Sequence, residues 1–226
     1  MEIKNLILII VAVLNFFIGL VVILKNHKSH INLSFGLFLL SVVGWSIGLA
    51  MSRELAGTLE ALHWGNSTYY FGALIAIFFL YFSFIFPFQK KKFTFFQKFL
   101  IILPFLFILF ILMKGDLLIK GMTVKPWGYD VTFGKFWYLI YSIYFIAYML
   151  WAYLNIWKSY LTASGYIKFQ LKFILISLIV AGFFGMVFDL ILPYFGYWKL
   201  NWFGPYFSIF VLFSISYLVF FKDKLR

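Results

Sequence analysis

The sequence predicts an all-α polytopic membrane protein, a seven-transmembrane helix bundle that uses residues 1–226 as a single domain. Of the 226 residues, 65% are hydrophobic and only 12% are charged, and the mean hydropathy is +1.00. Soluble domains are about half apolar and a quarter charged, so lipid must cover much of this surface. Apolar stretches of about 20 residues, long enough to cross a bilayer as helices, recur seven times along the chain.

The seven predicted spans are joined by connections that are richer in polar and basic residues. The fourth span is the weakest, because its uninterrupted apolar run, residues 99–113, is short and contains Pro104. The spans are Leu6–Leu24, Leu33–Met51, Ser67–Phe88, Phe95–Met113, Phe136–Trp157, Phe173–Leu192 and Trp202–Phe221.

The basic residues predict how the bundle is oriented. If the amino terminus lies outside, the inner segments are 25–32, 89–98, 158–172 and 222–226. They hold twelve of the nineteen Lys and Arg residues and a single acid, Asp223. Because positive residues collect in cytoplasmic loops, this distribution predicts an outer amino terminus and an inner carboxyl terminus. The net charge of +12 is thereby interpreted as a topology signal, and no nucleic-acid partner is expected.

Two outer connections have patterns of their own. Residues 52–66 carry leucines at helical spacing, which predicts a short helix lying on the membrane surface. Residues 114–135 contain a Pro-Trp-Gly turn between two partly alternating segments, which predicts a β-hairpin over the outer mouth.

The sequence offers little catalytic chemistry. There is no cysteine, and the histidines, His27, His30 and His63, are not in a metalloprotease frame. No phosphate-binding loop and no paired intramembrane carboxylates occur. We therefore expect neither an enzyme, nor a metal site, nor a cofactor.

Asp189 is the only acidic residue inside a predicted span. A mid-membrane aspartate costs about 2.5–3.5 kcal/mol on insertion scales, so it normally faces a cavity or a partner. Asp189 lies four residues before Pro193, about 6 Å by helical rise, and is therefore close to the outer edge. Two interpretations stay open: a residue of an outward-facing ligand pocket, or a structural partner of Lys199 or of backbone groups.

Aromatic and amide side chains supply the other ligand-binding candidates. Four tyrosines share one face of the fifth span and could line a polar pocket or fill the core with internal hydrogen bonds, the commoner arrangement. Trp64 could be an interfacial anchor or a ligand contact, and Asn66 a core or pocket residue. The candidates are Asp189, Trp64, Asn66, Tyr141 and Tyr148.

The second span contains a small-residue motif. Gly44 and Gly48 form a GxxxG pattern with Ser41 on the same side, which allows close helix contact. This contact is expected either within the bundle or at the seam of a homodimer.

Several sparse markers recur along the chain. They are Lys168 and Gln170 before the sixth span, Leu192, Pro193 and Gly196 after it, Phe220, Phe221, Lys222 and Leu225 at the end of the chain, and Asn32, Phe35 and Trp45 in the second span. With these markers the carboxyl-terminal third resembles the amino-terminal seven-helix input region of bacterial histidine kinases. The second span, "NLSFGLFLLSVVGWSIGLAM", and the approach to the third, "ALHWGNSTYYFG", resemble the same family.

This resemblance implies a sensory module in the bacterial cytoplasmic membrane. Such a module senses an extracellular or membrane-borne small ligand and relays the signal through the seventh helix, with Lys222 and Leu225 at its exit. The printed sequence contains no phosphoacceptor helix and no ATP-binding domain. The output is therefore expected from a cytoplasmic domain or subunit such as a histidine kinase.

Two alternatives belong to other functional classes. The first is a small seven-helix solute transporter built from two three-helix repeats, although the first three and last three spans share no Gly, Pro or Asn pattern. The second is a scaffolding subunit of another membrane protein.

Overall fold

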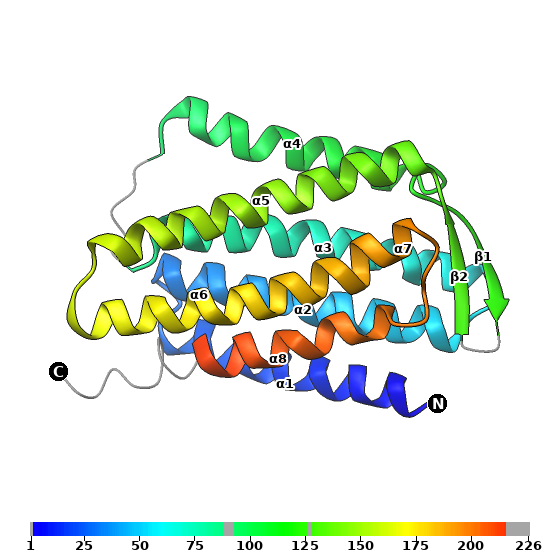
Figure 1. Ribbon diagram of the computed structural model, residues 1–226, viewed down its shortest axis with the longest axis horizontal. Coiled ribbons are helices and arrows are strands. Elements are labelled where there is room, and N and C mark those ends of the chain that lie inside the picture. Colours follow the sequence, from blue (N-terminus) through cyan, green and yellow to red (C-terminus); the bar gives the residue numbers. More distant parts are fainter. Residues whose placement is uncertain (1, 88–92, 126–127, 216–226) are drawn as a thin grey trace.

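The computed structural model describes residues 2–87, 93–125 and 128–215, and these residues form an all-α bundle with one small hairpin (Figure 1). Six helices are long and apolar enough to cross a membrane, which makes the chain a multi-pass membrane protein. The helices are α1 (Ile3–Lys25), α2 (His30–Glu54), α3 (Leu59–Ile85), α4 (Phe95–Met113), α5 (Lys135–Thr162), α6 (Gly165–Met186) and α8 (Gly204–Ile215). A π-helical turn, η1 (Val187–Ile191), and α7 (Leu192–Tyr194) continue α6, and a 3₁₀ turn, η2 (Asn201–Phe203), precedes α8.

Six of the helices close into a ring, with α4 on its outside. In order around the ring, α1 packs on α2, α2 on α3, α3 on α5, α5 on α6, α6 on α8, and α8 returns to α1. Helix α4 packs mainly along α3 and α5, and it lies at the edge of the bundle in Figure 1. The ring therefore encloses an interior to which α4 contributes little.

Local sequence signals explain where several helices begin. Ser29, Thr58 and Thr94 each accept a hydrogen bond from a backbone N–H in the first turn of the helix that follows. At α4 the Gln97 Oε1 atom also accepts a hydrogen bond from the Thr94 backbone N–H, which completes a capping box. These caps satisfy N–H groups that a helix start otherwise leaves unpaired.

The predicted hairpin is present and closes one end of the bundle. Strands β1 (Ile119–Lys125) and β2 (Gly128–Phe133) pair antiparallel, with an irregularity between Ile119 and Gly121. Strand β1 packs on α3, where the Met122 side chain fills the space above Gly65. We call the end that carries this hairpin the hairpin end, and the amino terminus lies there too (Figure 1).

The surface helix expected over residues 52–66 is wrong. Helix α2 continues to Glu54, Gly57 adopts a left-handed conformation with φ of 95°, and Thr58 caps α3, which starts at Leu59. The leucines at helical spacing thus belong to the ends of two long helices. The left-handed glycine interrupts any continuous helix between them.

The other predicted spans compare closely with the structure. The fourth span matches α4 residue for residue, and the first, second, fifth and sixth lie within longer helices. The third, Ser67–Phe88, extends past the end of α3 at Ile85, and its last residue lies outside the described residues. Of the seventh, residues 202–215 are helical, whereas 216–221 lie outside the described residues, as do the exit residues Lys222 and Leu225.

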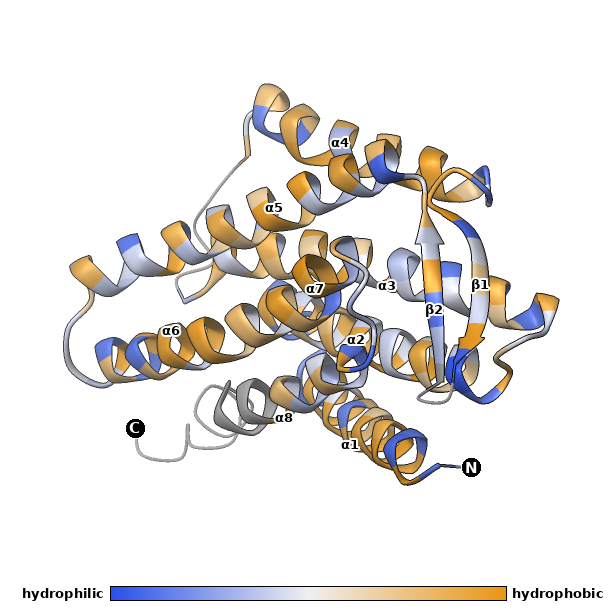
Figure 2. Ribbon diagram, turned by 45° about the vertical axis from the view of Figure 1, so that its right-hand side comes forward, coloured by the Kyte–Doolittle hydropathy of each residue, from blue (hydrophilic) through white to orange (hydrophobic). Residues whose placement is uncertain are grey.

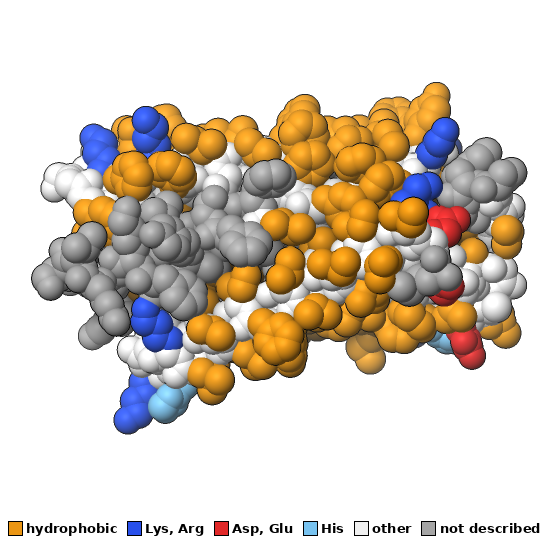
Figure 3. Space-filling view, turned by 90° about the horizontal axis from the view of Figure 1, so that it is seen from below, with side chains coloured by type: hydrophobic (Ala, Val, Ile, Leu, Met, Phe, Trp, Pro, Cys, Tyr) orange, Lys and Arg blue, Asp and Glu red, His pale blue; other side chains and the backbone are white. Residues whose placement is uncertain are grey.

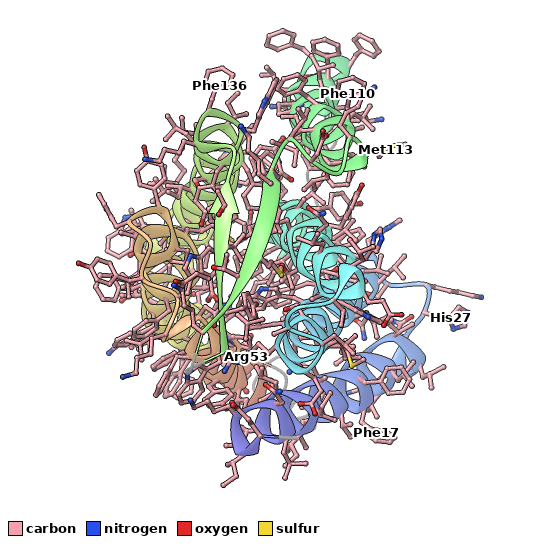
Figure 4. All side chains as sticks on the ribbon, turned by 90° about the vertical axis from the view of Figure 1, so that its right-hand side faces the viewer. Phe17, His27, Arg53, Phe110, Met113 and Phe136 are labelled. Carbon is pink, nitrogen blue, oxygen red and sulfur yellow. The ribbon has the colours of Figure 1, made fainter. Side chains whose placement is uncertain are left out.

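The outer surface of the bundle is suited to hydrocarbon. Apolar residues colour the helices along their length in Figure 2, and apolar side chains cover the middle of the face seen in Figure 3, with charged groups gathered towards its two ends. Figure 4 shows four apolar side chains that point away from the bundle: Phe17, Phe110, Met113 and Phe136. Phe17, for example, is 60% exposed. Exposed apolar surface on this scale indicates contact with lipid.

The tyrosines of α5 join this helix to its neighbours. The hydroxyls of Tyr141 and Tyr144 donate to the carbonyls of Tyr69 (3.1 Å) and Ala73 (3.0 Å) on α3, one turn apart. Tyr148 donates to the Ile101 carbonyl of α4 at 2.6 Å. All of these rings are buried, so each hydroxyl has found a partner inside the protein.

We expect Tyr144→Phe to lower the free energy of unfolding by about 0.5–1.5 kcal/mol, because the variant loses the bond to the Ala73 carbonyl while its ring stays packed. Thermal unfolding in detergent measures the change. Tyr153→Phe on the same helix is the control, since its hydroxyl makes no hydrogen bond to any described residue. Equal effects of the two substitutions would contradict the conclusion that the hydroxyls of the α5 tyrosines stabilise the packing of this helix on its neighbours.

Candidate functional site

A cavity of about 120 Å³ lies inside the ring, beneath the hairpin. Its walls come from α2, α3, α5, α6, η1, both strands, η2 and α8. The lining is mostly aliphatic and aromatic, with few polar groups. A largely apolar cavity with a few convergent polar groups is the usual form of a small-molecule site.

The most polar residue of the wall, Asp189, lies in the π-helical turn η1. Pro193 explains part of this local structure, because proline has no N–H with which to bond the carbonyl four residues earlier. That carbonyl, of Asp189, instead accepts a hydrogen bond from the Tyr138 hydroxyl at 3.1 Å. Tyr138 also donates to the Leu190 carbonyl at 3.0 Å, so α5 supports the irregular turn. Single π-turns inside α-helices occur frequently at functional sites.

One oxygen of the half-buried Asp189 carboxylate, Oδ2, is itself buried and has no hydrogen-bond partner among the described residues. The carboxylate packs directly against Gly204, the first residue of α8, where any Cβ atom would collide with it. Glycine at this position therefore allows α8 to approach η1 closely, and the carboxylate lies between the two helices.

A second unsatisfied polar atom belongs to the same wall. Trp198 is 5% exposed and lines the cavity, yet within the described part of the chain its indole Nε1 has no acceptor. Native proteins leave few buried polar atoms unpaired, and each one calls for an explanation. Here an unpaired acceptor and an unpaired donor line one cavity.

A buried arginine organises the hairpin end around the cavity. The Arg53 side chain is 3% exposed, and it donates from Nε to Asn5 Oδ1 (3.1 Å) and from Nη1 to Asn201 Oδ1 (3.2 Å). Its Nη2 pairs with Glu2 at 3.5 Å. Figure 4 shows Arg53 beside the turn end of the hairpin. One side chain thus connects the ends of α1 and α2 to the residue where η2 begins.

The network continues from Arg53 to the cavity wall with a defined direction. Asn201 donates to Tyr129 Oη at 3.4 Å, and Tyr129 lies 3.0 Å from Ser52 Oγ. The Ser52 hydroxyl donates to the Leu49 carbonyl, so Tyr129 must be the donor to Ser52. Burial raises the pKa of Tyr129, which keeps the phenol neutral. Asn201 and Tyr129 both line the cavity.

A side pocket of about 230 Å³ lies between α5 and α6. It shares four lining residues with the main cavity, Met149, Leu178, Gly182 and Met186. Its outer rim includes Ile179 and Phe183, which are largely exposed on the apolar surface. The cavity wall on this side is therefore thin and faces the lipid.

The structure brings together two of the five candidates from the sequence. Asp189 and Tyr141 line the cavity, and the Tyr141 hydroxyl is already used by α3. Tyr148 faces α4, Trp64 is half-buried away from the cavity, and Asn66 donates to the Gly115 carbonyl at 3.1 Å. Gly44 and Gly48 pack on α3 within the bundle, against Phe71 and Ser67.

Sequence reasoning missed Arg53, Tyr129, Trp198 and Asn201. Arg53 lies in the segment 52–66, for which the sequence predicts a surface helix, and no motif singles out the other three. One signal was available, because a tyrosine, a tryptophan and an asparagine outside the spans all flank apolar segments that end at the same side of the bundle.

Comparison with models of protein families, with curated proteins and with solved structures found no match for this chain.

We expect Asp189→Asn to raise the free energy of unfolding by about 1–3 kcal/mol, because a neutral amide of the same shape replaces a half-buried acid whose buried Oδ2 atom has no partner among the described residues. Thermal unfolding of the purified protein measures the shift. The matched control is Asp130→Asn on β2, where the carboxylate pairs with Lys125 at 3.8 Å near the surface and contributes about 0–1 kcal/mol. A greater loss of stability in Asp189→Asn than in the control would contradict this account of the site.

We expect Arg53→Met to lower the free energy of unfolding by about 2–4 kcal/mol, because Asn5 and Asn201 would lose charged donors inside the protein. Lys120→Met, at an exposed position of β1, provides the control for the same exchange. Chemical denaturation in mixed micelles compares the two. If both variants unfold like the parent, Arg53 does not hold the hairpin end together.

Proposed function

We propose that this chain is the input module of a membrane sensor, in which a small ligand occupies the cavity beneath the hairpin. Occupancy changes the packing of α6 against α8, and a cytoplasmic output domain or subunit, such as a histidine kinase, reads the change. The single observation that carries the proposal is the buried Asp189 Oδ2 atom, which has no hydrogen-bond partner among the described residues and lies against the first residue of α8 in the cavity wall.

The proposal includes seven membrane-crossing helices with the amino terminus outside. The described acids support this orientation, since the loops and helix ends at the hairpin end contain Glu2, Glu54, Glu60, Asp116 and Asp130. The described loops and helix ends at the opposite end contain lysines and no acid. On the face in Figure 3, acidic side chains appear only towards the hairpin end. By sequence, the segments predicted to lie inside hold twelve of the nineteen Lys and Arg residues, and under the positive-inside rule that side is cytoplasmic.

The proposed relay from the cavity to α8 depends on residues that line the cavity and also contact or begin this helix. Gly204 leaves no space between α8 and the Asp189 carboxylate, so a group that binds the carboxylate must alter this contact. Asn201, three residues earlier, lines the same cavity and is held by Arg53. A ligand shifts such an equilibrium only by its differential affinity for the two packings. A site shared by two helices is suited to that requirement.

Single-cysteine labelling tests the orientation, and the absence of native cysteine makes the readout unambiguous. We expect a membrane-impermeant maleimide to label Asp116→Cys in intact cells and Asp223→Cys only after permeabilisation. The reverse pattern would overturn the proposed orientation. Labelling of both from one side would overturn the odd number of spans.

A cavity-filling variant tests the relay. Gly185 lines the cavity and has open space where a Cβ would lie, so Gly185→Leu places a side chain where a ligand would be. We expect spin labels at Lys158→Cys and Leu225→Cys to change their separation by about 2 Å, the scale of helix shifts in switching proteins. Gly121→Leu on β1, also beside open space, is the control and should leave the distance unchanged. A parental distance distribution in Gly185→Leu would refute the relay.

A further inference from the structure

The cavity wall contains the acidic side chain of Asp189, and among the described residues no basic side chain pairs with it. Arg53 is the nearest buried cation of the network, but its donors are directed to Asn5, Asn201 and Glu2. Lys199, the other basic residue of this connection, forms no ion pair with Asp189 among the described residues. An acidic group inside a protein is costly to ionise when it has no partner, and a bound cation would offset that cost.

Aromatic rings surround the same space. Tyr69, Tyr129, Tyr141, Phe145 and Trp198 all line the cavity, and Tyr69 meets Tyr141 edge-on with ring centres 5.1 Å apart. Ring faces attract organic cations, and the attraction grows when water is excluded. An acidic group among aromatic walls therefore favours an ammonium over an anion. A carboxylate ligand could accept from the Trp198 N–H but would face Asp189 without a neutralising group.

The size of the cavity limits what can carry this ammonium group. A volume of about 120 Å³ is close to that of engineered protein cavities that hold a benzene ring. Away from Asp189 the lining becomes apolar, with Phe38, Ile75, Met149 and Leu178. Leu178 lies eleven residues before Asp189 on the same continuous helix, about 16 Å by helical rise. The space thus has an acidic end and an apolar end.

We infer that the cavity binds a small amphiphilic organic amine, with the protonated nitrogen at Asp189 and an apolar body of about one ring directed along α6. This inference depends on the proposed function, because it names the ligand class of the same site. The ammonium group could belong to a free amine or to the headgroup of an aminophospholipid. The cavity volume of about 120 Å³ favours a free amine over the headgroup of an aminophospholipid.

Three fluorinated probes of one shape test the charge selection: 4-fluorobenzylamine, 4-fluorobenzyl alcohol and 4-fluorobenzoate. Dissociation constants are measured by fluorine NMR on the purified protein in maltoside micelles, which contain no amine. We expect the ammonium probe to bind at least tenfold more tightly than the alcohol, and the benzoate to bind most weakly. Asp189→Asn should weaken the ammonium at least tenfold and leave the alcohol unchanged. Asp130→Asn should change none of the three.

The outcomes separate the ligand class from the proposed function. If the ammonium and alcohol probes bind equally, and this binding is unaffected by Asp189→Asn but lost in Gly185→Leu, the amine ligand class is wrong. The proposal that the cavity is a ligand-binding site would then still hold. Binding of none of the probes would overturn both. If added phosphatidylethanolamine competes with the ammonium probe, and phosphatidylglycerol does not, the amine class holds and its source is a lipid headgroup. Cooperative thermal unfolding of each variant shows that it is folded.

Discussion

The missing N–H of Pro193 shapes the functional end of this bundle. In a regular helix the Asp189 carbonyl would be paired along its own chain, and inside a membrane an unpaired carbonyl is costly. Here the sixth helix becomes π-helical over η1, and the Tyr138 hydroxyl of α5 donates a hydrogen bond to the Asp189 carbonyl. The position of the acidic side chain, its contact with Gly204 and the start of α8 are all arranged around this irregular turn.

Two kinds of polar contact hold the ring of helices in complementary ways. Along α5, tyrosine hydroxyls reach backbone carbonyls of α3, α4 and η1, which connects helices that apolar packing alone would leave free to slide. At the hairpin end, Arg53 joins α1, α2 and η2. The first set connects α5 to three neighbouring elements. The second reaches the cavity wall through Asn201 and Tyr129. Among the described residues, the same wall holds the unpaired Asp189 Oδ2 and Trp198 Nε1 atoms.

Hydropathy predicted most of the architecture, because membrane helices must be long and apolar whatever they pack against. The bounds of α4 and the presence of the hairpin followed from composition and turn residues alone. The surface helix over 52–66 failed because spacing of leucines cannot reveal that Gly57 is left-handed. Asp189 stood out because an acid in an apolar span is rare, whereas Arg53 looked like an ordinary loop residue. Its burial depends on Asn5 and Asn201, which are distant in sequence.

The thin wall between α5 and α6 bears on how the interior communicates with its surroundings. Its rim is made of side chains that a membrane would bathe in acyl chains, and four residues serve both the rim pocket and the cavity. A compound that dissolves in the bilayer would reach the cavity between α5 and α6, without passing the hairpin. The quantity governing occupancy would then be the mole fraction of that compound in lipid, and changes in membrane composition would tune sensitivity without any change in the protein.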